Sequence, residues 1–235
     1  MAMFDELGQL GASLATDRSV RAVVLRGSGE NFCAGIDLDI FSNSDAGIDA
    51  KALAPLEGTP ANRFQRAAYV WRELPVPVIC AIEGVAFGAG LQIALGADLR
   101  YATPDARLSV MEIRWGLIPD LAITVTAGNL VREDRLRELT YTGRVVSGRE
   151  ALDIGLLTAV YDDPVVAARK TARHIATKSP DAIRAMKKMF NECRDLDESQ
   201  SLALEAALQA GVLTGVNQKE AVAANIAARE PNFED

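Results

Sequence analysis

The chain has 235 residues, of which 49% are hydrophobic, so it can bury a substantial core within a single α/β domain. Its 25 basic and 32 acidic residues give a net charge of −7, and no cluster of Lys or Arg is dense enough to bind a nucleic acid. The three cysteines, Cys33, Cys80 and Cys193, are widely spaced in apolar segments, which argues against a disulfide framework or a metal site and favours a reducing, cytoplasmic location.

The first half of the chain alternates predicted helices and strands. Apolar residues at helical spacing indicate a helix over Met3–Leu14, and a β-branched run at Val20–Gly27 indicates a strand. A helix over Arg63–Leu74 and a fully buried strand over Val76–Ile82 repeat this order. Residues 41–62, rich in Ser, Asp, Gly, Ala and Pro, are predicted to form a mobile loop over a binding site.

The middle of the chain continues the alternation. Gly84, Gly88 and Gly90 lead into an apolar helix, LQIALGA. Further elements are expected as strands over 99–102 and 107–110, a helix after Pro119, a helix over 132–141, a short helix started by a capping box of Ser147 and Glu150, and a strand in LLTAVY.

The chain is helical from Asp163 almost to its end. Ser179 with Pro180 is expected to start one helix, Asp195 or Asp197 another, and Asn217 with Glu220 a last one. We therefore predict an α/β core over residues 1–162, followed by a C-terminal helical region over residues 163–235.

Neither a membrane span nor a secretion signal is indicated. The most apolar stretch, Val76–Ala97, is interrupted by Glu83, Gln92 and four glycines, and the N-terminus carries acidic residues where a signal peptide needs basic ones. The sole histidine, His174, lies late in a helical segment, so Ser-His-Asp catalysis and His-rich zinc sites have little to build on.

Two glycine-containing turns, Glu30–Leu38 and Gly84–Gln92, each follow a predicted buried strand. Neither matches the GxGxxG pattern of a dinucleotide site or the GxxxxGK[ST] pattern of a phosphate loop. One interpretation is that each turn points a backbone N–H into a pocket, and the other is that both are ordinary strand-to-helix turns. Their spacing alone leaves both interpretations open.

Three ordered segments resemble the signatures of the enoyl-CoA hydratase/isomerase family, also called the crotonase family. They are FCAGIDL at 32–38, AIEGVAFGAGLQIALGADLRYA at 81–102 and MEIRWGLIPD at 111–120, and the similarity continues through SGREALDIGLLTAVY to the C-terminus. The resemblance implies a crotonase-like α/β spiral of ββα repeats, whose C-terminal helical region packs in a homotrimer or a dimer of trimers. Family members usually begin with further strands that shape the CoA pocket, and these are missing before Phe4.

The resemblance also implies the chemistry. The family's two oxyanion amides fall on Ala34 and Ala89, which would stabilise the enolate of an acyl-CoA thioester. Gly35, Ile36, Asp37 and Gly88 are expected around the substrate, and coenzyme A enters as part of that substrate, so no separate cofactor is expected.

The acid and base residues are assigned in the same way. Family hydratases use two glutamates, and the second falls on Glu112 while Gln92 stands at the first, where an amide cannot accept a proton. Asp120 stands where dienoyl-CoA isomerases carry a second acid, although it is equally placed to be a helix N-cap. Glu112, Asp120 and Gln92 are thus the candidate catalytic residues. Aromatic acyl-CoA dehalogenases, which share an aspartate at the position of Asp120, fit poorly because their histidine base is missing.

Several neighbouring residues are given structural roles. Asp37 is expected to fix the loop of Ala34 by accepting backbone hydrogen bonds, and Cys33 to be a small buried hydrophobe. Lys187 and Lys188 are expected on a solvated helix face. The predicted function is isomerisation or hydration of an enoyl-CoA. The alternative is a CoA-thioester-binding protein with little catalysis, because Gln92 replaces the first glutamate.

Overall fold

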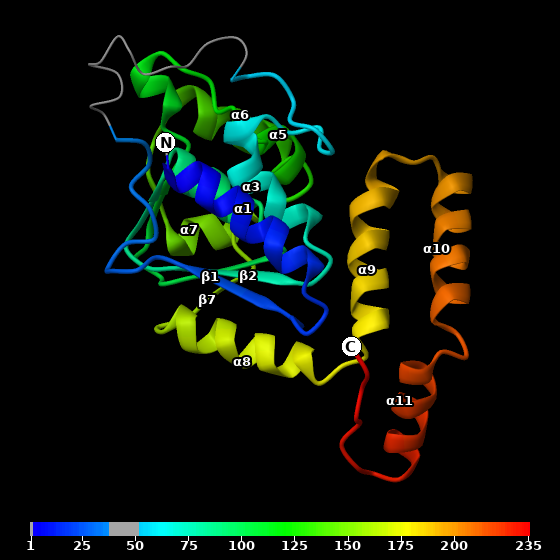
Figure 1. The fold of residues 1–235 in the computed structure, drawn as a ribbon. Coiled ribbons are helices and arrows are strands. Elements are labelled where there is room, and N and C mark those ends of the chain that lie inside the picture. Colours follow the sequence, from blue (N-terminus) through cyan, green and yellow to red (C-terminus); the bar gives the residue numbers. More distant parts are fainter. Residues whose placement is uncertain (1, 38–51) are drawn as a thin grey trace.

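The computed structural model describes residues 2–37 and 52–235 (Figure 1). Half of the predicted loop over 41–62, residues 41–51, lies outside these residues. The strands are β1 (Val23–Arg26), β2 (Val78–Ile82), β3 (Val85–Phe87), β4 (Leu99–Ala102), β5 (Arg107–Ser109), β6 (Val146–Ser147) and β7 (Ala159–Val160). The helices are α1 (Ala2–Thr16), α3 (Arg63–Glu73), α4 (Ala89–Leu95), η1 (Glu112–Trp115), α5 (Ile123–Thr126), α6 (Glu133–Thr142), α7 (Gly148–Asp153), α8 (Pro164–Ala176), α9 (Pro180–Glu192), η2 (Cys193–Asp195), α10 (Glu198–Val212) and α11 (Val216–Ile226).

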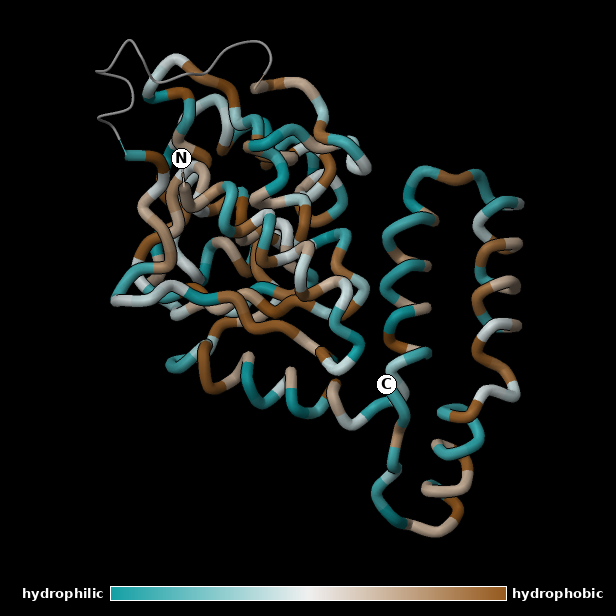
Figure 2. Tube along the Cα trace, viewed as in Figure 1, coloured by the Kyte–Doolittle hydropathy of each residue, from teal (hydrophilic) through white to brown (hydrophobic). Residues whose placement is uncertain are grey.

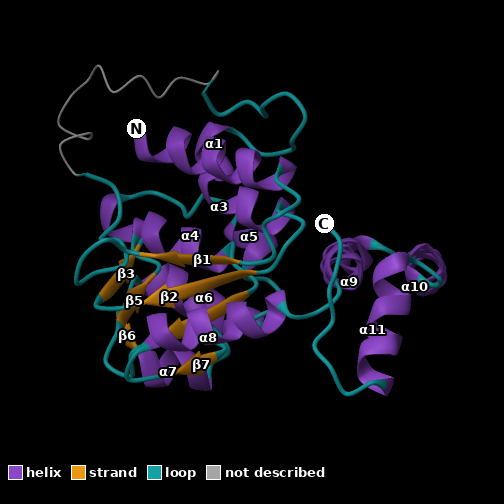
Figure 3. Cartoon of the chain, turned by 60° about the horizontal axis from the view of Figure 1, so that its bottom comes forward, coloured by secondary structure: helices purple, strands orange, loops and turns teal. Residues whose placement is uncertain are grey.

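The strands form two sheets, which confirms the α/β class. The larger sheet has the order β1-β2-β4-β7 with every neighbouring pair parallel, and the smaller has the order β3-β5-β6. In the smaller sheet β3 runs parallel to β5 and β5 antiparallel to β6. Figure 3 shows the smaller sheet beside the larger one. Helices α3 and α4 lie in the crossovers between parallel strands and pack on one face of the larger sheet, whereas α8, which follows the last strand, packs on the other.

The central strand β2 is buried on both faces, as its run of apolar residues predicts. Val78, Cys80 and Ile82 belong to the main core together with α3 and α4. Ile79 and Ala81 belong to a second cluster that α8 completes on the opposite face. The alternation of side chains along a strand therefore gives each face its own helical layer.

The prediction missed β3 and β6. These strands have three and two residues, and segments this short show too little alternation of apolar and polar residues to be predicted as strands. The helix starts were predicted better. Ser147, Asp163, Ser179 and Asp197 all cap helices with their side chains. The capping box at Ser147 is only half formed, however, because the Glu150 carboxylate pairs with Arg144 at 2.7 Å instead of turning back to the cap.

The prediction that Asn217 starts the last helix is wrong. Gly215 is the N-cap of α11, and Asn217 lies inside the helix, buried. Its side-chain Nδ2 donates to Asp181 Oδ2 at 2.8 Å, and its Oδ1 accepts from the Glu234 N–H at 2.8 Å. Asn217 therefore joins α11 to α9 and to the C-terminal segment, a long-range role that a local capping pattern cannot reveal.

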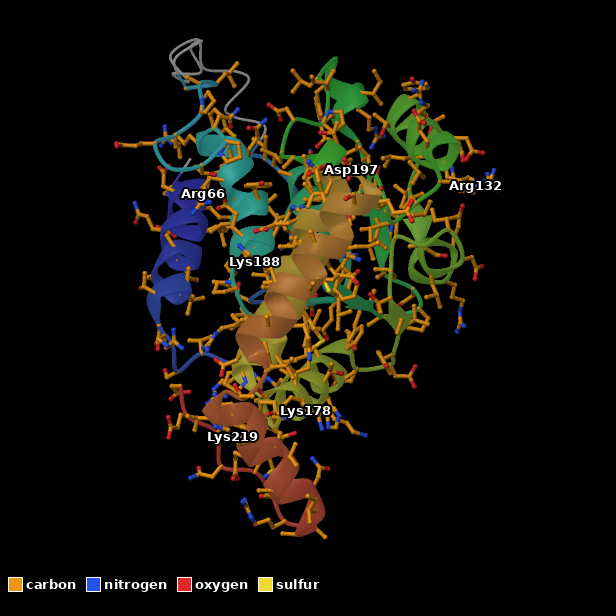
Figure 4. The ribbon with its side chains drawn as sticks, turned by 90° about the vertical axis from the view of Figure 1, so that its right-hand side faces the viewer. Arg66, Arg132, Lys178, Lys188, Asp197 and Lys219 are labelled. Atoms are coloured by element: carbon orange, nitrogen blue, oxygen red, sulfur yellow. The ribbon has the colours of Figure 1, made fainter. Side chains whose placement is uncertain are left out.

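Helices α9, α10 and α11 form an arm that stands to one side of the core (Figures 1 and 3). No residue of α10 is buried, and Leu202, Val216 and Ile226 expose much of their apolar surface. Figure 2 shows hydrophobic segments along this arm, and Figure 4 faces it, with Asp197 at the start of α10 and Lys219 in α11.

One of the two lysines expected to be solvated anchors the arm instead. Lys187 is buried, and its Nζ donates to Asp98 Oδ2 at 2.7 Å and to the carbonyls of Trp71 and Val76 at 2.9 Å each. A buried ammonium requires such a set of acceptors. Lys188 is exposed as expected and pairs with Glu192 along the helix. Of the described residues, no helix is long and apolar enough to cross a membrane.

Candidate active site

Two backbone turns lie side by side at the end of β3. A parallel bridge joins Cys33 to Ala86, in which the Cys33 N–H donates to Val85 O and the Phe87 N–H donates to Cys33 O, each at 3.0 Å. The residue after Cys33 is Ala34, and the two after Phe87 are Gly88 and Ala89. This pairing therefore brings together the two turns that the sequence singled out.

Glycines make the close approach possible. A Cβ at Gly35, which has a φ of +102°, would lie 3.1 Å from the Phe87 carbonyl oxygen, and one at Gly90 would lie 2.5 Å from the Cys33 carbonyl oxygen. Gly88 has a φ of +51°, a conformation that L residues with a side chain rarely adopt. The turns could not pack this closely around larger residues.

Ala34 and Ala89 each carry an N–H that makes no hydrogen bond to another described residue. Ala89 is the first residue of α4, where an N–H has no partner within the helix and carries the positive end of the helix dipole. Its φ is not positive, so its side chain causes no strain although the family commonly has glycine there. Both backbone amides are therefore available as donors.

The two turns line a cavity of about 130 Å³. Its walls include five of the residues predicted for oxyanion and substrate contacts and the candidate acid/base: Ala34, Gly35, Ile36, Gly88, Ala89 and Glu112. Met111, Trp115 and Leu117 complete the lining and were not predicted as site residues. The apolar residues that surround Glu112 in the sequence were the available signal for them.

Glu112 begins the short helix η1, and its carboxylate lies against Gly88. A Cβ on Gly88 would approach Glu112 Oε1 to 3.3 Å, so the carboxylate is packed beside the peptide that leads to the Ala89 N–H. Burial raises the pKa of Glu112, and the nearby charge of Asp120 raises it further, while its own backbone N–H and the Gln92 amide act in the opposite direction. A carboxyl group with a raised pKa is suited to proton transfer near neutral pH.

Gln92, on α4, contacts the Glu112 side chain and is 1% exposed. Its Nε2 donates to Glu112 Oε1 at 2.6 Å, and its Oε1 accepts from the Leu121 N–H at 2.8 Å. Gln92 does not line the cavity, so the structure places it in contact with the candidate acid/base rather than at the cavity surface. The Leu121 N–H was not foreseen, because no sequence pattern marks a backbone donor 29 residues away.

Asp120 is exposed and does not line the cavity in the described part of the chain. Partial desolvation nevertheless raises its pKa, and its charge influences Glu112. The interpretation of Asp120 as a helix N-cap is wrong, because α5 begins at Ile123 and Ala122 occupies the cap position. Asp120 is thus free of that structural role.

Other predicted residues lie at the rim. Asp37 is exposed and adjoins the undescribed segment 38–51, and its role in fixing the loop stays a prediction. Cys33 is only half-buried, whereas the sequence predicted a buried residue. A larger groove of about 870 Å³ lies between α3 and α9, lined mainly by charged and polar side chains, several of which pair with one another. It contains neither of the two turns, so the smaller cavity is the candidate active site.

Comparison with known proteins defines the class to which this fold and site belong. The family model described as "Enoyl-CoA hydratase/isomerase" matches residues 1–235. The crystal structure of an enoyl-CoA hydratase from Bacillus anthracis superposes with a TM-score of 0.87 at 29% identity, covering 99% of this chain and 88% of that one. The fold is therefore the crotonase fold.

Curated relatives include isomerases. The 1,2-epoxyphenylacetyl-CoA isomerase of Escherichia coli is 32% identical, over 98% of this chain and 87% of its own length. The peroxisomal Delta(3,5)-Delta(2,4)-dienoyl-CoA isomerase of Arabidopsis thaliana is 30% identical, over 98% of this chain and 85% of its own length. This chain belongs to the enoyl-CoA hydratase/isomerase family and is an enzyme of that family.

Proposed function

We propose that this enzyme isomerises an enoyl-CoA through a thioester enolate, with Ala34 and Ala89 as oxyanion donors, Glu112 as base and Asp120 as acid. The observation that carries the proposal is the cavity in which Glu112 lies beside both turns. A thioester oxygen bound by the two N–H groups would place the adjacent carbon within reach of that carboxylate. Gly35, Ile36 and Gly88 would contact the same part of the substrate, and Asp37 would support the loop.

The proposed reaction moves one double bond. Ionised Glu112 removes a proton from C2 of a 3-enoyl-CoA, and the electron pair of that C–H bond passes to the thioester oxygen as an enolate. Protonated Asp120 then delivers a proton to C4 as the double bond forms between C2 and C3. The raised pKa values of both carboxyl groups support this exchange. Proton exchange with water resets the pair, and no cofactor beyond the CoA of the substrate is needed.

Isomerisation is favoured over hydration by Gln92. A hydratase of this family uses its first glutamate to activate water, and here that position holds an amide whose two polar atoms are already hydrogen-bonded to Glu112 and Leu121. An amide cannot take a proton from water at neutral pH. The relatives named as isomerases are consistent with this choice.

Two substrates distinguish the candidate reactions. The purified enzyme is incubated separately with crotonyl-CoA and a 3-enoyl-CoA while the absorbance of the conjugated thioester is followed. A gain of absorbance on the 3-enoyl substrate supports isomerisation, whereas a loss on crotonyl-CoA supports hydration. Full turnover by Glu112→Ala would show that the base is wrongly assigned.

The same experiment tests a binding protein with little catalysis, which the replacement of the first glutamate by Gln92 favours. That alternative predicts no absorbance change on either substrate together with a raised melting temperature in the presence of acyl-CoA. If neither substrate gives an absorbance change and the folded protein still binds acyl-CoA, the isomerase proposal is wrong and the binding-protein alternative is supported.

We also propose that the arm α9–α11 mediates assembly into a homotrimer or a dimer of trimers in the cytoplasm. The support is the apolar surface that α10 and α11 leave exposed, since a helix gains most of its stability by burying such a face. Leu202, Val216 and Ile226 would be covered by a second copy of the chain.

A further inference from the structure

The Gln92 side chain is a fixed bridge between Glu112 and Leu121. Its orientation is unambiguous, because the Leu121 N–H can only donate, and the amide oxygen of Gln92 therefore faces it at 2.8 Å. The amide nitrogen must then face Glu112, where it donates to Oε1 at 2.6 Å. Gln92 and Leu121 are both buried, so water does not compete for the bond between them.

This geometry makes the two oxygens of Glu112 unequal. Oε1 accepts a hydrogen bond from the Gln92 N–H. A proton on Oε1 that pointed toward Gln92 would meet this donor, so Oε1 cannot hold one there. Oε2 is buried and has no hydrogen-bond partner among the described residues. A buried oxygen without a partner is costly and marks a group that awaits a ligand. The proton that Glu112 gains from a substrate therefore belongs on Oε2.

The second bond of Gln92 extends the bridge to the next acid in the chain. Leu121 directly follows Asp120 and is itself buried, so holding its N–H holds the backbone that carries Asp120. One side chain thus ties the base and the acid to the same buried helix α4, whose first residue is Ala89.

We propose that Gln92 is a positioning residue that confines the transferred proton to Glu112 Oε2 and holds the segment of Asp120 at a set place relative to it. This inference rests on the proposed isomerisation and gives Gln92 a role in it other than proton transfer. It also explains why the loss of a carboxylate at this position is compatible with catalysis.

The test uses two variants of Gln92 with opposite effects on the pH profile. Gln92→Met keeps the volume but removes both hydrogen bonds. We expect kcat to fall by about tenfold or more, the scale of a lost bond to a charged group, with KM little changed. The acidic limb of the kcat profile should also move to higher pH, because Glu112 loses a donor that favours its ionised form.

Gln92→Glu supplies the conservative rescue. While the pair of carboxyl groups holds one proton, the introduced acid can donate to Glu112 Oε1 and accept from Leu121 as the amide does, so activity should stay close to that of the wild type. At higher pH both groups ionise, and the alkaline limb of the kcat profile should report this added ionisation besides that of Asp120, which alone gives the wild type its alkaline limb. Gln9→Met, an exposed glutamine on α1, is the matched control and should change neither profile.

The outcomes separate this inference from the proposed function. An active wild type whose Gln92 variants lose activity by the same factor at every pH would overturn the positioning role, and so would variants with unchanged kinetics. An inert wild type would overturn the isomerase proposal instead. In that case the positioning role is tested by an NMR titration of the ¹³C-labelled Glu112 carboxyl group. If folded Gln92→Met had the same titration midpoint as the wild type, the bridge from Gln92 to Glu112 would be contradicted.

Discussion

The Phe87 N–H donates to the Cys33 carbonyl oxygen at 3.0 Å, and this bond aligns the two turns that carry Ala34 and Ala89. Cys33 and Phe87 are 54 residues apart, so the spacing of the two candidate donors depends on tertiary packing rather than on either turn alone. Gly90 also lies close to this carbonyl, where a methyl group would not fit.

Gly90→Ala therefore tests the importance of that spacing. Gly90 has a helical backbone that alanine would favour by about 1 kcal/mol, but the added Cβ would meet Cys33 O at 2.5 Å and Cys33 Cβ at 2.7 Å. We expect Cys33 and Ala34 to shift and kcat to fall by about tenfold or more, because donors for an oxyanion act only at hydrogen-bond distance. Gly29→Ala, where nothing lies within 4 Å of the added carbon, should leave kcat unchanged. Equal rates for both variants would show that the spacing is unimportant.

Glu112→Gln should make the protein more stable at neutral pH. The pKa of Glu112 is raised in the folded state, mainly by burial, so folding favours its protonated form. The stability that this group contributes is fully present below its unfolded pKa and is lost as pH rises through its folded pKa. Glutamine avoids that loss and can still accept from Gln92. Thermal melts should show a higher Tm for the variant at pH 7 and a difference that shrinks as pH falls through the carboxyl range, whereas Glu6→Gln, at an exposed position of α1, should show neither effect.

Asp120→Asn should separate proton removal from proton delivery. If Glu112 takes the C2 proton and Asp120 protonates C4, the variant should lose about 10²-fold or more in isomerisation. It should still exchange the C2 hydrogen of the substrate with deuterium from D₂O, measured by mass spectrometry. Asp105→Asn, at an exposed loop position, is the control. Loss of exchange together with isomerisation would indicate that Asp120 acts in the first step or supports the fold of the site.

The sequence predicted those features whose cause is local. The N-caps at Ser147 and Ser179 depend on a side chain and an N–H three residues away, and both were found where expected, while Asp197 caps the helix for which Asp195 was the other candidate. The resemblance to known signatures located Ala34, Ala89 and Glu112, which the structure gathers around one cavity.

Features that depend on distant residues were missed or misread. In the sequence, Lys187 is one of two neighbouring lysines on a predicted helix. Its hydrogen-bond acceptors belong to residues 89 to 116 positions away, so the sequence pattern does not indicate that it is buried. Gln92 reads as a lost catalytic carboxylate until its contact with Leu121 is seen. In both cases the residue type is compatible with several environments, and the packing of separate elements selects one.

Lys187→Met should destabilise the protein by about 3 kcal/mol, because it removes the side-chain donor of two carbonyl groups and the charged partner of Asp98, which keeps the Val78 N–H as a donor. The lower end of the usual range applies since the Asp98 side chain is 30% exposed and water can reach it. Urea denaturation measures the change. Lys188→Met on the next residue is a close control, as its exposed pair with Glu192 is worth about 0.5 kcal/mol or less. Similar losses for the two variants would contradict the anchoring role of Lys187.

Charges introduced on the arm should dissociate the assembly without disturbing the core. Leu202 on α10 and Ile226 on α11 are 59% and 83% exposed, so Leu202→Asp with Ile226→Asp should cost a lone chain little stability. In a trimer, the same changes would place two carboxylates per chain in an apolar interface, where an unpaired charge is strongly unfavourable. Sedimentation velocity should therefore show a trimer or hexamer for the wild type and monomers for the double variant, while circular dichroism shows the same helix content for both. Lys219→Ala, a charge removed from α11, controls for changes on the arm that leave its apolar residues intact. A monomeric wild type would contradict the assembly proposal and would require the apolar residues of α10 and α11 to remain exposed to water.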